Sequence, residues 1–167
     1  VEVADAHGCR WMPLQDVFLG PGKSAIDPRR AMLTRLRFRP TAAGEGSAFT
    51  RVMRPQGVAL PMISMAARLQ VDDNKTITAV RISLGPAGPV PHLAIPAMNL
   101  LKGRQAVPQE FKQAADTILA SVPLRSSKHR ATREYREEMI RTQLPVILNR
   151  AADRAHGGQM VPQGLGL

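Results

Sequence analysis

The sequence has 167 residues, enough for one domain core or for one domain with part of a second. A hydrophobic fraction of 44% excludes a disordered chain, and no apolar run reaches the roughly 18 residues that a membrane-spanning helix needs. The net charge of +10 favours nucleic acid, an acidic membrane, an acidic protein or a phosphorylated cofactor, although scattered basic residues also fit a solvated surface. The single cysteine, Cys9, excludes an internal disulfide or a thiolate metal cluster and fits a reducing, cytoplasmic setting.

The first forty residues predict short strands joined by turns. Val1 and Val3 alternate with polar residues and run into the turn at residues 5–8, and a return strand is expected at 10–14. Glycine and proline residues mark a loop over 20–28, and a strand follows over 31–38 until Pro40 ends it. Because the sequence opens on Val1, inside a strand and without a signal peptide, we expect it to be the C-terminal part of something longer.

The middle of the sequence predicts a hairpin. The small residues TAAGEG, at 41–46, predict a flexible joint and the best domain boundary. Strands are expected over 49–54 and 58–71, and a polar turn at 72–75 leads into a strand over 77–84. A loop at 85–91 precedes a short edge strand at 92–95.

The last seventy residues change to a helical period. Pro96 and Pro108 are placed to open two helices, and Thr132 is a candidate N-cap for a third. A proline inside the third helix, Pro145, is expected to kink it, and residues 156–167 are expected to form a flexible tail. Strands followed by helices predict an α+β fold, in which a small antiparallel sheet is flanked by helices on one face.

The motifs of common active sites are missing from the sequence. The segment Gly20-Pro21-Gly22-Lys23-Ser24 ends like a phosphate-binding loop, but Val17 stands where the first glycine is required. The four histidines lack metal-ligand spacing, and no dinucleotide-binding glycine motif, carboxylate pair or nucleophile elbow is present. No catalytic residue and no metal ligand is therefore predicted, and these patterns alone leave the function open.

Segments that span most of the sequence resemble one protein family. These are residues 18–38 (FLGPGKSAIDPRRAMLTRLRF), 47–69 (SAFTRVMRPQGVALPMISMAARL) with the strand AVRISLGPAGPVP after it, and 131–151 (ATREYREEMIRTQLPVILNRA). In this order they are similar to the FAD-binding (medium) flavoprotein subunit of molybdenum hydroxylases, the carbon monoxide dehydrogenase and xanthine dehydrogenase family. The resemblance implies that 1–41 end an FAD-binding subdomain and that 45–155 form the C-terminal α+β domain. It also implies that the glycine-rich loops for the FAD pyrophosphate belong upstream of Val1, so the sequence alone would bind FAD poorly.

The resemblance also implies one wall of a flavin pocket. Met32 and Leu33 match apolar positions that pack near the flavin in this family. The basic residue after the aromatic of the SAF segment approaches the ring, which makes Arg51 the first candidate and Thr50 the second. A cation there would stabilise negative charge on the reduced ring. Arg54 is expected to support the turn at 55–57, and Ala59 stands where many relatives have Asp.

A further mark of the family, S-x-x-Y-R, corresponds to Thr132, Tyr135 and Arg136. We expect Tyr135 to pack on the sheet with its hydroxyl bonded at the edge. We expect Arg136 to join an ion pair with Glu134 or Glu138, or to contact another subunit. No catalysis is assigned to this segment.

The function implied by the resemblance is electron transfer through FAD in an oxidoreductase. Electrons would pass from a molybdopterin-binding large subunit through a [2Fe-2S] small subunit to FAD, and on to an external acceptor, within a cytoplasmic heterotrimer that involves no nucleic acid and no membrane span. The alternative is a basic nucleic-acid-binding α+β module that uses Arg51, Arg54, Arg81 and the arginines of the last helix. Its shortage of stacking aromatics counts against it. A purely structural fragment without a ligand is the third interpretation.

Overall fold

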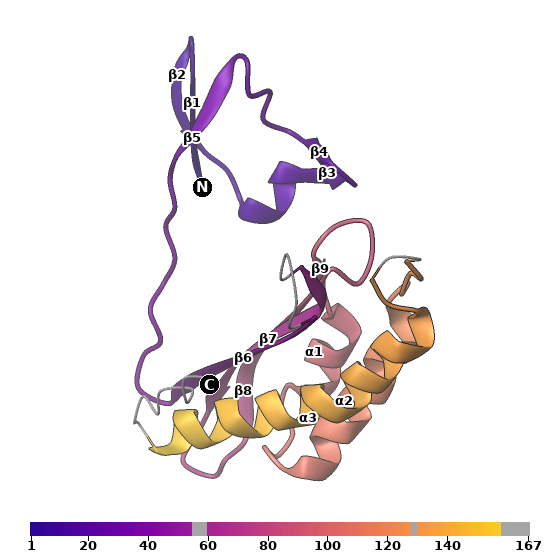
Figure 1. Ribbon diagram of the computed structural model, residues 1–167. Helices are drawn as coiled ribbons and strands as arrows, with labels where there is room; N and C mark the ends of the chain where they lie inside the picture. The colour runs from indigo at the N-terminus through magenta and orange to yellow at the C-terminus, as the bar shows by residue number, and fades with distance from the viewer. Residues whose placement is uncertain (55–59, 128–129, 158–167) are drawn as a thin grey trace. The chain divides into compact units, whose positions relative to one another are not determined.

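The chain folds into two compact units, which are described here separately. The structure, a computed structural model, describes residues 1–54, 60–127 and 130–157 (Figure 1). The first unit comprises Val1–Pro40 together with Pro89–Pro91, and the second comprises Thr41–Gly88 and the chain from His92 onward. The unit boundary therefore falls between Pro40 and Thr41.

The first unit contains short antiparallel strands and little core. Strands β1 (Glu2–Asp5), β2 (Gly8–Trp11) and β5 (Ala31–Arg35) form a sheet in the order β2-β1-β5. A 3-10 turn, η1 (Leu14–Val17), leads into the hairpin of β3 (Phe18–Gly20) and β4 (Lys23–Ser24). The segment that ends like a phosphate-binding loop is thus the tip of this hairpin, where Gly22 has a φ of 68°.

The second unit is built on a four-stranded antiparallel sheet. Strands β6 (Glu45–Met53), β7 (Pro61–Val71), β8 (Ile77–Gly85) and β9 (His92–Leu93) are hydrogen-bonded in that order. The predicted turn between β7 and β8 is present, and the Asp72 carboxylate accepts the backbone N–H groups of Asn74 and Thr76.

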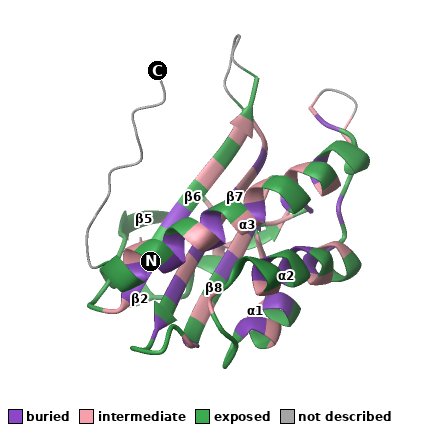
Figure 2. Cartoon of the chain, turned by 90° about the horizontal axis from the view of Figure 1, so that it is seen from below, coloured by how far each residue is buried: buried purple, intermediate pink, exposed green. Residues whose placement is uncertain are grey.

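The helices pack on one face of this sheet. They are α1 (Ile95–Leu101), α2 (Pro108–Ser121) and α3 (Arg133–Gly157), and α3 lies along β6 and β7 (Figure 1). Buried and more exposed residues alternate along β7, as its striped colouring in Figure 2 shows, because only one face is covered. The α+β class predicted from the sequence is confirmed. The core of the second unit includes Ile63, Met65, Leu69, Ile82, Leu84, Phe111, Ile118, Ile140, Leu144 and Leu148.

The predicted helix starts are present. Pro96 and Pro108 lie in the first turns of α1 and α2. The Thr132 hydroxyl accepts the Tyr135 backbone N–H at 3.2 Å, which is the N-cap interaction expected before α3. The helix continues through Pro145 to Gly157, and the rest of the predicted tail lies outside the described residues.

The predicted joint TAAGEG is in part a strand. Glu45 and Gly46 are buried residues of β6, which pairs with β7 from its first residue. A Cβ built on Gly46 would lie 2.0 Å from the Ala151 carbonyl oxygen and 2.5 Å from the Ala155 nitrogen. Gly46 therefore allows α3 to approach the backbone of β6 closely, rather than making the chain flexible.

The expectations for Tyr135 and Arg136 were wrong. The Tyr135 side chain is 39% exposed, and Arg136 is the fully buried one. Arg136 donates from Nε to the Met62 carbonyl oxygen at 2.9 Å and from a terminal nitrogen to the Arg125 carbonyl oxygen, with no ion pair to Glu134 or Glu138 among the described residues. Main-chain oxygens of β7 and of the segment before α3 accept hydrogen bonds from Nε and Nη1, which favours burial of the guanidinium, while Nη2 has no partner among the described residues.

Candidate functional site

The face of the sheet opposite the helices is the candidate site in the second unit. Phe49 lies across from Ala66, and Arg51 lies across from Ser64, at positions that alternate with the buried positions of β6 and β7. The Phe49 ring is 46% exposed and the Arg51 side chain is exposed. This uncovered surface, which we call the open face, presents an aromatic ring and a guanidinium two residues apart.

The two candidate flavin-contacting residues on β6, Thr50 and Arg51, lie on opposite faces of the sheet. Thr50 lies across from Met65, which is fully buried under the helices, so Thr50 belongs to the helix-covered face. Arg51, the next residue, belongs to the open face. Arg54 is exposed, and the turn at 55–57 that it was expected to support lies outside the described residues, as does Ala59.

The two apolar candidates lie in β5 of the first unit. Met32 pairs with Ala4 and Leu33 with Val3, so successive side chains point to opposite faces of the small sheet. Met32 is 65% exposed and Leu33 is 40% exposed. Each is available to a ligand or a partner, but one flat ring cannot contact both from the same face of β5.

The first unit has a further apolar surface around the end of its strands. A hollow of about 570 Å³ is lined by Trp11, Leu14, Leu36, Arg37 and Phe38, with Val1, Met12 and Pro13. The Arg37 guanidinium lies 4.7 Å from the centroid of the Trp11 ring, a cation–π contact. Exposed aromatic and aliphatic side chains of this size are typical of a surface that another polypeptide covers.

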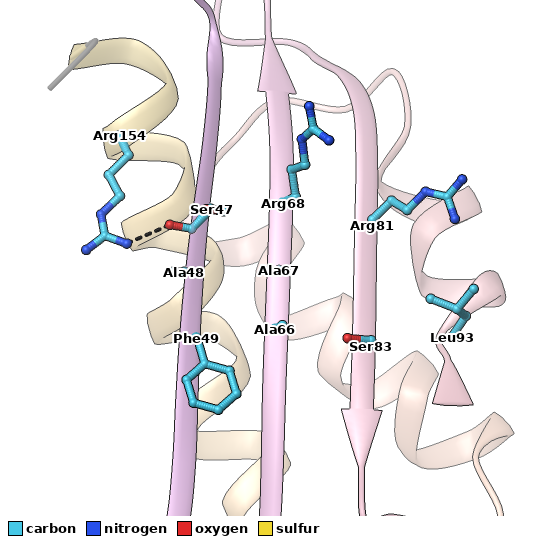
Figure 3. Close-up of a pocket in the computed structure, with 10 residues that line it drawn as sticks. All are labelled: Ser47, Ala48, Phe49, Ala66, Ala67, Arg68, Arg81, Ser83, Leu93 and Arg154. Atoms are coloured by element: carbon cyan, nitrogen blue, oxygen red, sulfur yellow. Dashed lines mark hydrogen bonds between the residues drawn. The ribbon is translucent and has the colours of Figure 1, made fainter. Parts of the chain in front are cut away.

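A second hollow, of about 460 Å³, lies on the open face of the second unit (Figure 3). Small side chains form its floor, with Ala66 on β7 and Ser83 on β8. Phe49 and Leu93 line one end, and Arg68 and Arg81 line the other, as Figure 3 shows. We call it the arginine hollow; its complete lining is Ser47, Ala48, Phe49, Ala66, Ala67, Arg68, Arg81, Ser83, Leu93 and Arg154.

The charges of the arginine hollow are unevenly compensated. Arg68 and Arg81 are direct cross-strand partners on β7 and β8. The buried carboxylate of Glu45 forms an ion pair with Arg68, whereas Arg81 is exposed and has no ion pair within the described residues. Arg154 reaches from α3 around β6 and donates to the Ser47 carbonyl oxygen at 2.6 Å (Figure 3). The site therefore has a net positive charge.

The buried Arg136 lies outside the open face. Desolvation lowers the pKa of its guanidinium, and the nearby charges of Arg125 and Arg130 lower it further. An arginine nevertheless stays protonated in a folded protein, so Arg136 contributes a fixed buried cation that holds β7, the Arg125 segment and α3 together.

Within residues 1–54, 60–127 and 130–157, no group of three or more His, Cys, Asp or Glu side chains could hold a metal ion. In the same part of the chain, no helix is long and apolar enough to cross a membrane. What the open face offers is a cation, an aromatic ring and a flat floor, which together can bind and orient a planar or anionic group.

Comparison with known proteins assigns the chain to a family. The family model described as CO dehydrogenase flavoprotein C-terminal domain matches residues 47–151, which cover the sheet and helices of the second unit. The chain belongs to this CO dehydrogenase flavoprotein C-terminal domain family. No match was found among the curated proteins.

Solved structures share the fold of this flavoprotein domain family. A carbon monoxide dehydrogenase from Hydrogenophaga pseudoflava that lacks the Mo-pyranopterin moiety of the molybdenum cofactor aligns with a TM-score of 0.81 and 22% identity, over 92% of this chain and 52% of that one. Quinoline 2-oxidoreductase from Pseudomonas putida 86 aligns with a TM-score of 0.75 and 21% sequence identity, over 93% of this chain and 52% of that one. Reconstituted CO dehydrogenase from Oligotropha carboxidovorans aligns with a TM-score of 0.75 and 25% sequence identity, over 93% of this chain and 52% of that one. The chain thus spans about half the length of the chains it matches.

The arginine hollow was not predicted from the sequence of this flavoprotein-family chain. Its floor consists of alanine and serine residues, which carry no motif. The predicted turn at 72–75 starts the β7–β8 pairing at Val71 and Ile77, but the register shifts by one residue between Gln70 and Val71. Because only this shift places Arg68 across from Arg81, the turn alone could not have predicted the pair.

Proposed function

We propose that this chain contributes one wall of the flavin pocket in the FAD subunit of a molybdenum hydroxylase. The observation that carries the proposal is the match of residues 47–151 to the flavoprotein family, together with the exposed cation of Arg51 on the open face. Within an oxidoreductase of this kind, the FAD subunit passes electrons from [2Fe-2S] clusters to an external acceptor. The molybdopterin and iron–sulfur cofactors would belong to partner subunits, in a cytoplasmic complex.

The residues present fit a flavin. Phe49 and Arg51 lie on the same uncovered face, and the neighbouring position on β7 is the small Ser64. A flat ring could rest over Ser64 beside the Phe49 and Arg51 side chains. Met32 and Leu33 stay candidates for apolar contact with a flavin, because both side chains are exposed on the first unit. Thr50, on the helix-covered face, is the less suitable of the two candidates on β6.

When bound, the isoalloxazine supplies the redox chemistry of the subunit. Arg51 would place a positive charge beside the pyrimidine side of the ring, where negative charge develops on reduction. Phe49 would limit access of water to the ring through its apolar surface. No proton transfer is assigned to the chain.

The first unit exposes apolar side chains that further polypeptide would cover. Its exposed Met32, Leu33, Trp11 and Phe38 support the presence of a covering surface, and the matched solved chains are about twice as long as this one. We propose that this covering polypeptide carries the loops that hold the FAD pyrophosphate.

Spectroscopy on the native complex tests the proposed function. The protein is isolated from its source with the polypeptides that remain bound to it, and its absorbance is recorded before and after reduction. A flavin spectrum, with iron–sulfur absorbance from a partner, is the expected result, and a colourless complex would refute the proposal. The nucleic-acid alternative predicts instead an affinity for DNA or RNA that falls steeply with salt through counterion release.

A further inference from the structure

We propose that the arginine hollow is a binding site for a flat ring that carries an oxyanion, either a phosphate or a carboxylate. The oxyanion would lie between Arg68 and Arg81, and the ring would lie over Ala66 and Ser83 toward Phe49 and Leu93. The proposal does not depend on the flavin assignment, because it rests on the hollow and its charges alone.

The first step is the placement of like charges. Arg68 and Arg81 lie directly opposite each other on neighbouring strands, an arrangement that destabilises a sheet by itself. The Glu45 carboxylate neutralises Arg68, but Arg81 keeps an uncompensated charge within the described residues. Local arrangements that destabilise a fold are expected mainly at functional sites. An oxyanion bound between the two guanidinium groups would replace their repulsion with two attractive, charge-assisted contacts.

The second step is the distribution of charge over the second unit. Its acidic residues other than Glu45 lie in the turn after β7 or on helices α2 and α3, and none of them is on the open face. They are Asp72, Asp73, Glu110, Asp116, Glu134, Glu137, Glu138 and Asp153. The open face also carries Arg51, so an anion that approaches this face meets several guanidinium groups.

The third step is the shape of the hollow. Its volume of about 460 Å³ is within the range of small-molecule sites, roughly 300–1,000 Å³. The floor is flat because Ala66 and Ser83 are cross-strand partners with short side chains, and Phe49 stands at the edge with its ring exposed. A flat ring can therefore lie on the sheet and touch the Phe49 ring. In Figure 3 the Arg68 and Arg81 side chains extend away from Phe49, so the bound anionic group would require these long side chains to turn toward the hollow.

The test is a nuclear magnetic resonance titration of the intact chain at constant ionic strength, which keeps diffuse screening the same. The probes are 5′-AMP and nicotinate, each a ring with an anion, together with inorganic phosphate and adenosine, which have only one of the two features. We expect saturable shifts in the amides of the hollow with at least one ring-bearing anion. Binding about tenfold tighter than that of phosphate or adenosine would show that both features count. Binding of 5′-AMP without binding of nicotinate would identify the oxyanion as a phosphate. Binding of nicotinate without binding of 5′-AMP would identify it as a carboxylate.

Variants separate the charge from the floor. Arg81→Gln should weaken the ring-bearing anion and phosphate about tenfold and leave adenosine unchanged. Ala66→Leu fills the floor, so it should weaken the ring-bearing anion and leave phosphate unchanged. Arg141→Gln removes the same charge from the exposed side of α3 and should change neither. Circular dichroism confirms that each variant is folded.

Two results would overturn the proposal. One is the absence of saturable binding of both 5′-AMP and nicotinate at the amides of the hollow. The other is an equal loss of affinity in Arg81→Gln and Arg141→Gln, which would show attraction to the overall positive charge rather than to a site.

Discussion

Replacement of Gly46 by alanine tests how closely α3 approaches the sheet. The added Cβ would lie 2.0 Å from the Ala151 carbonyl oxygen, 2.5 Å from the Ala155 nitrogen and 2.9 Å from the Arg154 Cβ. The two shortest contacts are with the main chain of α3, so no side-chain rotation relieves them. The helix must move away from β6 by more than 1 Å for the Cβ–oxygen distance to reach ordinary contact, about 3.4 Å.

This movement would loosen the packing of Leu148, Ala151 and Ala152 against the sheet. Overpacking of a core costs about 1–3 kcal/mol and occasionally more, whereas the lower entropy of the unfolded alanine chain returns about 0.4–1 kcal/mol. Because the clash is with rigid main chain, we expect the upper part of this range, a net loss of about 2–3 kcal/mol. For a chain of this size, that corresponds to a Tm lower by roughly 4–12 °C.

Urea and thermal unfolding, followed by the helical circular dichroism signal, measure the effect. Gly157→Ala is the matched control, since a Cβ there meets nothing within 4 Å and lies at the end of the same helix. The control should stay within about 0.5 kcal/mol of the parent. A Gly46→Ala chain as stable as the control would refute the close approach of α3 to β6.

Three further predictions concern single side chains. Arg136→Lys should lower the free energy of unfolding, measured by urea denaturation, by about 2 kcal/mol, because lysine cannot hydrogen-bond the Met62 and Arg125 carbonyl oxygens in the same geometry. An unchanged free energy of unfolding would contradict the stabilising role of these two hydrogen bonds. Arg81→Gln should raise the free energy of unfolding by about 0.2–1 kcal/mol without ligand, since it removes a like-charge pair, and a loss of stability would argue against strain in that pair. The pKa of Glu134 is lowered by its backbone hydrogen bond at the start of α3 and by a hydrogen bond with the Thr132 hydroxyl. The ionised carboxylate therefore stabilises the fold fully above the pKa that this group has in the unfolded chain, and this stabilisation is lost as the pH falls through its pKa in the folded chain. Glu134→Gln should therefore flatten the acid side of a plot of Tm against pH, and an unaltered slope would count against it.

The helical half of the fold was predictable because its signals are local. Pro96, Pro108 and Thr132 mark helix starts through backbone chemistry that does not depend on the tertiary structure. The turn at 72–75 likewise fixes the β7–β8 hairpin through the Asp72 side chain.

Features that depend on long-range contacts were missed. Hydrophobic periodicity does not identify a charged residue that is buried in the core, so Arg136 was expected at the surface in an ion pair. In the structure its acceptors are the main-chain oxygens of Met62 and Arg125, which the sequence pattern does not indicate. A glycine among small residues reads as a joint, and only the packing of α3 shows why Gly46 must lack a side chain. For the candidate site, the alternation of side chains along β6 places Arg51 and Thr50 on opposite faces of the sheet. Which of these faces the helices cover depends on tertiary packing, so the sequence could not choose between the two residues.

The potential of the flavin tests the central proposal most directly. In the native complex, a spectrophotometric redox titration compares the parent with Arg51→Gln, and Arg141→Gln serves as the charge-matched control. Loss of an interaction worth about 1.5–3 kcal/mol with the reduced ring corresponds to about 30–60 mV for two electrons. We predict a flavin potential lower by that amount in Arg51→Gln and unchanged in Arg141→Gln; a complex without flavin, or equal potentials in the parent and Arg51→Gln, would contradict the proposal.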